Sequence, residues 1–189
     1  MDIRQVLRSQ FDAALDMLEH TVRLCPDAMW DDPADRNRFW HVAYHVLFYT
    51  DLYLSPNELA FTPWALHREH HQFFGALPWP PHDPVAIGAP YTRDDVLAYL
   101  ALCRDHVAGQ LASVNLDAPS GFEWLPFGKL ELQLYNLRHI QQHTGELMER
   151  LGARVGVDVP WVGMGGMGGG GLTRTTRVDT EPRVAAGTM

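Results

Sequence analysis

The sequence predicts an all-α protein, an up-and-down four-helix bundle with one long crossover between helices 2 and 3. Four segments of about twenty residues repeat apolar side chains at steps of three and four, the spacing of one helix face. A proline-rich stretch separates the second segment from the third, and a glycine-rich stretch follows the fourth. Four such helices with one long connection are typical of a bundle with a single crossover.

The first two predicted helices cover residues 2–24 and 35–54. Pro26 ends the first helix, whose apolar face is formed by Ile3, Leu7, Phe11, Ala14, Leu18 and Val22. The second helix is apolar almost all round (FWHVAYHVLFYTDLYL), so we expect it to be the most buried. Asp31, Asp32 and Pro33 supply its start signals, and Ser55-Pro56-Asn57 ends it.

The third and fourth predicted helices cover residues 92–115 and 128–151. Thr92 and Asp95 have the spacing of a capping pattern at the start of the third helix. The apolar face of this helix is formed by Val96, Leu100, Cys103, Val107, Leu111 and Val114. We expect the fourth helix to end at Gly152, because glycine favours the position after a helix.

The connections divide the chain into one folded domain and a C-terminal extension. The crossover over residues 55–91 contains seven prolines and is too long for a simple turn, and residues 64–74 could form a short helix within it. Gly163 to Gly171 is glycine-rich, and the polar residues that follow show no helical period. We therefore expect a bundle over residues 1–152 and a Gly-rich flexible C-terminal tail over residues 153–189, with flexibility beginning near residue 157.

Composition excludes several classes of function. The 189 residues include 15 basic and 23 acidic side chains, a formal net charge of −8, which disfavours nucleic-acid binding. The only two cysteines, Cys25 and Cys103, are too far apart for a structural zinc module. No run of 18 apolar residues predicts a membrane span, and the N-terminal residues lack the apolar run of a signal peptide. We expect a cytoplasmic protein.

Two pairs of histidines, each four positions apart, point to a metal site. His139 and His143 lie on one face of the fourth predicted helix, one turn apart, where two imidazoles can share an ion. His41 and His45 have the same spacing in the second helix, where His45 shares a face with apolar residues and needs a partner for its nitrogens. The alternative is hydrogen-bonded histidines in a core. Three imidazoles would leave a coordination position open, and they suit Zn, Ni, Fe or Cu.

The remaining candidates favour ordinary roles. We expect His67, His70 and His71 to be solvated on the crossover, and the isolated His20, His82 and His106 to be surface or boundary residues. Glu146 could orient a ligand imidazole or act as a base, although a solvated carboxylate is favoured. Four aromatic residues are candidate pocket walls, with core packing as the favoured alternative: Trp40, Tyr49, Trp124 and Phe127. No nucleophile motif or phosphate-binding loop is present, so the catalytic residues stay unknown.

These residues resemble the DinB superfamily (DinB/YfiT-like). The similarity lies in AYHVLFYTDLYL of the second helix and RHIQQHTGEL followed by LMERLG in the last, and it covers roughly residues 1–152. The resemblance implies a four-helix bundle with one long crossover and a metal triad of His45, His139 and His143. His41 is the alternative to His45. It also implies thiol-dependent transferase or isomerase chemistry with a small thiol, and a homodimer.

Two hypotheses of function follow. The first is a metal-dependent enzyme of thiol-dependent transferase or hydrolase type, acting on a small molecule, with a divalent Zn, Ni or Fe ion held by the three histidines. The second is a non-catalytic bundle that binds or senses a metal or small ligand. A third possibility is that all the histidines are structural.

Overall fold

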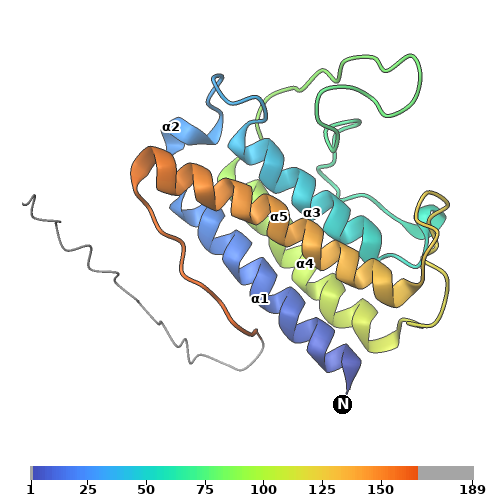
Figure 1. Cartoon of the computed structure of the whole chain (residues 1–189). Helices are drawn as coiled ribbons and strands as arrows, with labels where there is room; N and C mark the ends of the chain where they lie inside the picture. The colour runs from blue at the N-terminus through green and yellow to red at the C-terminus, as the bar shows by residue number, and fades with distance from the viewer. Residues whose placement is uncertain (1, 166–189) are drawn as a thin grey trace, which may run out of the picture.

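The computed structural model describes residues 2–165, and the described chain is helical (Figure 1). Four long helices form the molecule: α1 (Ile3–Leu24), α3 (Phe39–Leu54), α4 (Arg93–Ser113) and α5 (Lys129–Val155). A single turn, α2 (Asp27–Trp30), and a 3₁₀ turn, η1 (Glu58–Ala60), lie in the connections. Two isolated bridges are the only β-type pairings among the described residues. The predicted all-α fold is confirmed.

The four long helices pack as a bundle in which α1 and α3 occupy opposite corners. Each of these two helices contacts both α4 and α5. Helices α1 and α5 run in one direction and α3 and α4 in the other (Figure 1). Because α3 and α4 are parallel, the chain must return along the whole bundle between them. This return explains the length of the crossover.

Helix α3 forms the centre of the core, as its all-round apolar pattern predicts. Every residue of α3 is buried except His45 and Tyr49. The inward face of α1 adds Leu7, Phe11, Leu15 and Leu18, which are almost fully buried. Burial of each such side chain contributes about 1.5–3 kcal/mol, so the shared apolar core holds the bundle together.

The helix ends differ from the sequence prediction at two places. Helix α5 runs to Val155 and ends at Gly156, not Gly152, because Gly156 has φ +66° and its N–H bonds the carbonyl oxygen of Gly152. Helix α3 begins at Phe39, not at residue 35, since Asp35 faces Arg154 from a turn before the helix. The predicted cap of α4 is confirmed: Thr92 and Asp95 form a reciprocal capping box.

The crossover packs against the bundle without a helix over residues 64–74. Turns occupy this stretch, and the only helical turn of the crossover is η1. Its aromatic residues provide the attachment: the Trp64 ring stacks on Tyr99 of α4 with ring centroids 4.6 Å apart. The Tyr91 carbonyl oxygen accepts a 2.8 Å bond from Trp30 Nε1.

The chain continues past α5 along α1 (Figure 1). Val157 and Val159 pack against the core, and the amide of Gly165 donates to the carbonyl oxygen of Ser9 at 3.0 Å. Most of the predicted flexible tail, residues 166–189, lies outside the described residues. The division of the chain at residue 152 stays a prediction.

Among the described residues, no helix is long and apolar enough to cross a membrane.

Candidate metal centre

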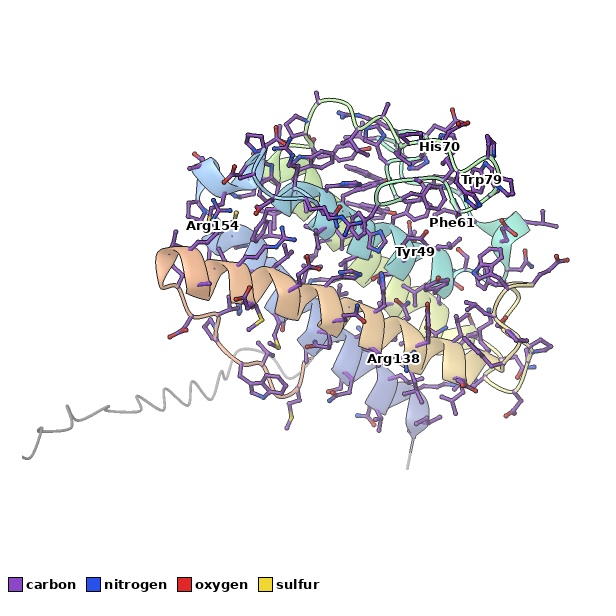
Figure 2. The ribbon with its side chains drawn as sticks, turned by 45° about the horizontal axis from the view of Figure 1, so that its top comes forward. Tyr49, Phe61, His70, Trp79, Arg138 and Arg154 are labelled. Carbon is purple, nitrogen blue, oxygen red and sulfur yellow. The ribbon has the colours of Figure 1, made fainter. Side chains whose placement is uncertain are left out.

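The structure brings His45, His139 and His143 together at the contact between α3 and α5. One ring nitrogen from each of the three lies within 4.8 Å of the others. The Nε2 atoms of His45 and His139 are 3.1 Å apart. The i,i+4 spacing of His139 and His143 places both rings on the side of α5 that faces α3. Tyr49, one turn after His45, and Arg138, next to His139, mark the two helices in Figure 2.

His45 is fixed by the crossover in a form that leaves Nε2 free. Its Nδ1 lies 2.6 Å from the carbonyl oxygen of Gln72, which can only accept a hydrogen bond. Nδ1 therefore carries the proton, and Nε2 keeps its lone pair. Burial, with smaller effects of the neighbouring His139 and His143, lowers the pKa of His45 to about 2, so this imidazole is neutral at physiological pH.

His139 lacks a protein partner on one side of its ring. Its Nδ1 is buried and makes no hydrogen bond with any described residue. Burial, with a smaller effect of His143, lowers the pKa of His139 to about 4, so this ring is neutral as well. Its Nε2 therefore faces the Nε2 lone pair of His45 without a charge of its own.

His143 is held by its own helix. Its Nδ1 donates to the Glu146 carboxylate at 3.0 Å, so Nε2 is the nitrogen that is left to bind an ion. Glu146, for which a solvated carboxylate was the favoured expectation, keeps 37% of its side chain exposed, and its carboxylate contacts both His143 and Arg150.

The donor set fits a divalent ion. Imidazole nitrogens are ligands that Zn, Ni and Fe accept. Two nitrogens bound at about 2.0–2.1 Å to one tetrahedral ion lie roughly 3.3 Å apart, close to the observed Nε2 separation. Without an ion the same two nitrogens form a 3.1 Å hydrogen bond, in which His139 Nε2 donates to the Nε2 lone pair of His45.

Two aromatic rings cover the triad. Phe74 of the crossover stacks on His45 with ring centroids 4.0 Å apart and lies 5.8 Å from His143. The ring centroid of Tyr49 lies 4.8 Å from that of His45 and 5.6 Å from that of His139. Tyr49, a candidate pocket wall for which core packing was the favoured alternative, lies at the triad. Phe74 was not foreseen, because nothing in the crossover sequence shows which ring turns inward.

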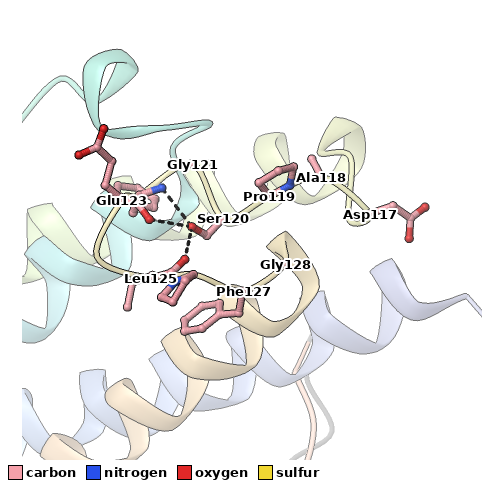
Figure 3. Close-up of a pocket in the computed structure, with 11 residues that line it drawn as sticks. Asp117, Ala118, Pro119, Ser120, Gly121, Glu123, Leu125, Phe127 and Gly128 are labelled. Atoms are coloured by element: carbon pink, nitrogen blue, oxygen red, sulfur yellow. Dashed lines mark hydrogen bonds between the residues drawn. The ribbon is translucent and has the colours of Figure 1, made fainter.

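The other expected pocket walls lie away from the triad. Trp40 is 1% exposed and packs in the core, as the favoured alternative predicted. Trp124 and Phe127 belong to the α4–α5 connection, where residues 117–123 and 125–128 line a surface hollow of about 690 Å³ (Figure 3). None of the three histidines lines this hollow, and the Ser120 hydroxyl that shapes it bonds only to its own loop. We therefore do not place the site there.

His41, the alternative ligand, turns away from α5. Its Nε2 donates to the carbonyl oxygen of His71 at 2.7 Å, and it does not join the cluster of nitrogens. The expectation that the crossover histidines are solvated is wrong for His71, which is 6% exposed. His67 is half-buried, with its Nδ1 2.6 Å from the Tyr44 hydroxyl.

Sequence reasoning also missed the pairing of His106 with Asp51. Asp51 is 2% exposed, and its Oδ1 accepts a 2.6 Å bond from His106 Nδ1. An aspartate on an apolar helix was the available signal, because a buried carboxylate needs a partner.

These features define a class of protein: a four-helix bundle with one long crossover and three histidines gathered between two of its helices. A family model of the DinB superfamily matches residues 10–147, and the chain belongs to this superfamily. Members of the superfamily bind metal ions. The comparisons with curated proteins and with solved structures gave no match.

Proposed function

We propose that this protein holds a divalent metal ion through His45, His139 and His143 and works as a metal-dependent enzyme of thiol-dependent transferase or hydrolase type. The observation that carries the proposal is the convergence of three ring nitrogens within 4.8 Å. The low pKa values of His45 and His139 support it, because these rings do not need to lose a proton before they bind an ion. Zn, Ni and Fe all suit the donor set.

Each residue of the site has a role in this proposal. His45 and His143 present Nε2 because their Nδ1 atoms donate to the Gln72 carbonyl oxygen and to the Glu146 carboxylate. Phe74 and Tyr49 exclude water from two sides of the cluster and offer apolar contact to a substrate. A divalent ion bound here supplies Lewis acidity, which lowers the pKa of a coordinated water or thiol toward neutrality.

The substrate that we propose is a small molecule, with a low-molecular-weight thiol as the nucleophile. Thiolate is a preferred ligand of the metals that imidazole also binds. The test compares the metal-loaded protein with the triple His→Ala variant in the reaction of a panel of cellular thiols with an electrophile. A rate equal to that of the variant for every thiol would contradict the enzymatic proposal.

One observation favours a non-catalytic binding or sensing role as the second candidate. Phe74 and the Gln72 carbonyl both press against His45 from the crossover, which covers part of the triad. A closed coordination sphere belongs to structural sites, whereas a catalytic ion keeps an exchangeable position. Water-proton relaxation of the Co²⁺-loaded protein distinguishes the two: an exchangeable water supports the enzyme, and its absence supports the binding role.

The metal itself is tested by elemental mass spectrometry of the untagged full-length chain. We expect near-stoichiometric metal in the wild type and loss of metal in His45→Ala and His139→Ala. His20→Ala is the matched control, because His20 is exposed on α1 and should leave the metal unchanged. Equal metal content in all four proteins would overturn the assignment of ligands.

The homodimer and the cytoplasmic location are also proposals. The family resemblance supports the dimer, and light scattering after size-exclusion chromatography tests it. A molecular mass of one chain at every protein concentration would contradict the proposed homodimer.

A further inference from the structure

The three histidines of the triad differ in what holds them. His45 donates to a neutral backbone carbonyl and His139 Nδ1 has no partner among the described residues. His143 alone donates to a charged group, the Glu146 carboxylate. Since a carboxylate draws the Nδ1 proton more strongly than a carbonyl does, His143 is the most electron-rich donor of the three.

Glu146 is itself held in place from the other side. Its Oε1 accepts a bond from the Arg150 guanidinium, one turn further along α5. Arg150 in turn donates to the carbonyl oxygen of Asn37 at 2.7 Å and lies 3.7 Å from the Asp35 carboxylate. The Arg150 side chain is only 16% exposed. Its two anchors belong to the turn before α3, the helix that carries His45.

These contacts restrict the rotation of the Glu146 side chain, which would be free if its carboxylate contacted only water. One carboxylate oxygen faces Arg150 and the other faces His143, so rotation of the side chain would break both bonds. The geometry fixes both the proton position and the orientation of the His143 ring. A His143 ring that changed its orientation would lower the affinity for the metal, because all three nitrogens must point toward the same ion.

We propose that Glu146, anchored by Arg150, is a positioning residue that orients His143 and strengthens it as a metal ligand. The inference rests on the proposed metal site and assigns no contact between Glu146 and the ion or a substrate. Through its bonds to Glu146 and to the carbonyl oxygen of Asn37, Arg150 also connects α5 to the turn before α3. This connection sets the spacing of α3 and α5 at the triad.

The test measures Zn²⁺ affinity of the full-length chain by competition with a chromophoric chelator. We expect Glu146→Ala to weaken binding by about 10–100-fold, which is the usual effect of removing such a partner. Glu146→Gln should lose less, because its amide oxygen can still accept the Nδ1 proton. Arg150→Met should show a smaller loss in the same direction. Glu149→Gln, an exposed carboxylate on the same helix, is the matched control and should bind as the wild type does.

A spectrum separates positioning from general destabilisation. At saturating Co²⁺, the visible bands of Glu146→Ala should shift relative to the wild type, because the His143 ring is no longer held. A purely structural residue would lower the melting temperature of the metal-free protein and leave these bands unchanged, which would overturn the proposal. So would a Zn²⁺ affinity within about twofold of wild type in Glu146→Ala, or an equal loss in Glu149→Gln.

The outcomes for the two proposals remain distinct. If the wild type itself binds no Zn²⁺, the proposed metal site fails. If the wild type binds Zn²⁺ and His139→Ala does not, while Glu146→Ala is unaffected, the metal site stands and only the positioning role fails.

Discussion

Asp51 brings a carboxylate into the interface between α3 and α4, where its described hydrogen-bond donors are His106 and Tyr99. The Tyr99 hydroxyl donates to Oδ2 at 3.1 Å, and His106 donates to Oδ1. Burial raises the pKa of Asp51 above its ordinary value, and the bond from His106 opposes this rise. A carboxyl with a raised pKa in the folded state contributes most stability below its unfolded pKa and loses that contribution as the pH rises through the folded value.

Removal of His106 should therefore destabilise the protein more at neutral pH than in acid. In His106→Ala the Asp51 carboxyl stays buried with one partner fewer, and we expect a loss of about 1–3 kcal/mol in the free energy of unfolding. At pH 4 the loss should be smaller, because the carboxyl takes up a proton. Urea unfolding at the two pH values measures the difference, with exposed His20→Ala as the control. An equal loss at both pH values would contradict this account.

The residues of the triad could be predicted from the sequence, whereas most of their partners could not. The four-residue spacing of His139 and His143 on one helix indicates a pair of ligands, and the family resemblance adds His45 to them. Gln72 and Phe74 come from a crossover without periodicity, so no pattern states which side chain meets His45. The contact of Glu146 with His143 could be predicted, since the two residues lie three positions apart on one helix. The position of Arg150 could not, because Arg150 bonds to the carbonyl oxygen of Asn37, 113 positions away in the chain.

At the scale of elements, the four long helices follow from apolar periodicity, and their ends do not. The capping box of α4 was visible because Thr92 and Asp95 are close in the chain. The end of α5 was misplaced because two glycines, Gly152 and Gly156, could each terminate it. Only the left-handed backbone of Gly156 decides between them.

Lys129 joins the start of α5 to the end of α3. Its ammonium group donates to the carbonyl oxygens of Pro56 at 2.9 Å, Ser55 at 3.3 Å and Ser120. Lys129 is 3% exposed, and burial lowers its pKa. We expect Lys129→Met to lower the free energy of unfolding by about 1–3 kcal/mol, since the buried carbonyl oxygens lose their donor.

Chemical denaturation checks the role of Lys129. The control is Arg8→Met on α1, which removes an exposed cation 3.9 Å from Asp12 and should cost less than about 1 kcal/mol. A Lys129 variant no less stable than this control would show that the three carbonyl contacts contribute nothing.

The segment after α5 is held against α1 by a close backbone approach. A Cβ on Gly165 would lie 2.2 Å from Asp12 Cβ and 2.7 Å from the amide nitrogen of Ala13, so Gly165→Ala should push the segment off the helix. Hydrogen–deuterium exchange of amides 157–165 should then rise. Gly163→Ala is the control, because its Cβ would meet nothing closer than Trp161 Nε1 at 3.6 Å. Unchanged exchange in Gly165→Ala would contradict the docking.

At the scale of the whole molecule, metal binding should stabilise the fold, because the three ligands come together only in the folded chain. Free Zn²⁺ at 100 times its dissociation constant should add about 2.7 kcal/mol. For a protein of this size, that amounts to a rise of roughly 5–11 °C in melting temperature. Scanning calorimetry with and without Zn²⁺ measures the rise, and His139→Ala should show none. The same rise in that variant would place the binding elsewhere.

The separation of the ligands along the chain also sets the order of events during synthesis. His45 and His139 lie 94 positions apart, on the second and last long helices of the bundle. A nascent chain that has exposed α1, α3 and the crossover carries one ligand already oriented by Gln72, but no pair of ligands. Both remaining imidazoles of the proposed site leave the ribosome on α5, so the full set of three ligands forms only after the last helix has docked. Metal uptake would then mark the completion of folding, and a chain truncated before α5 would not compete for the cell's metal.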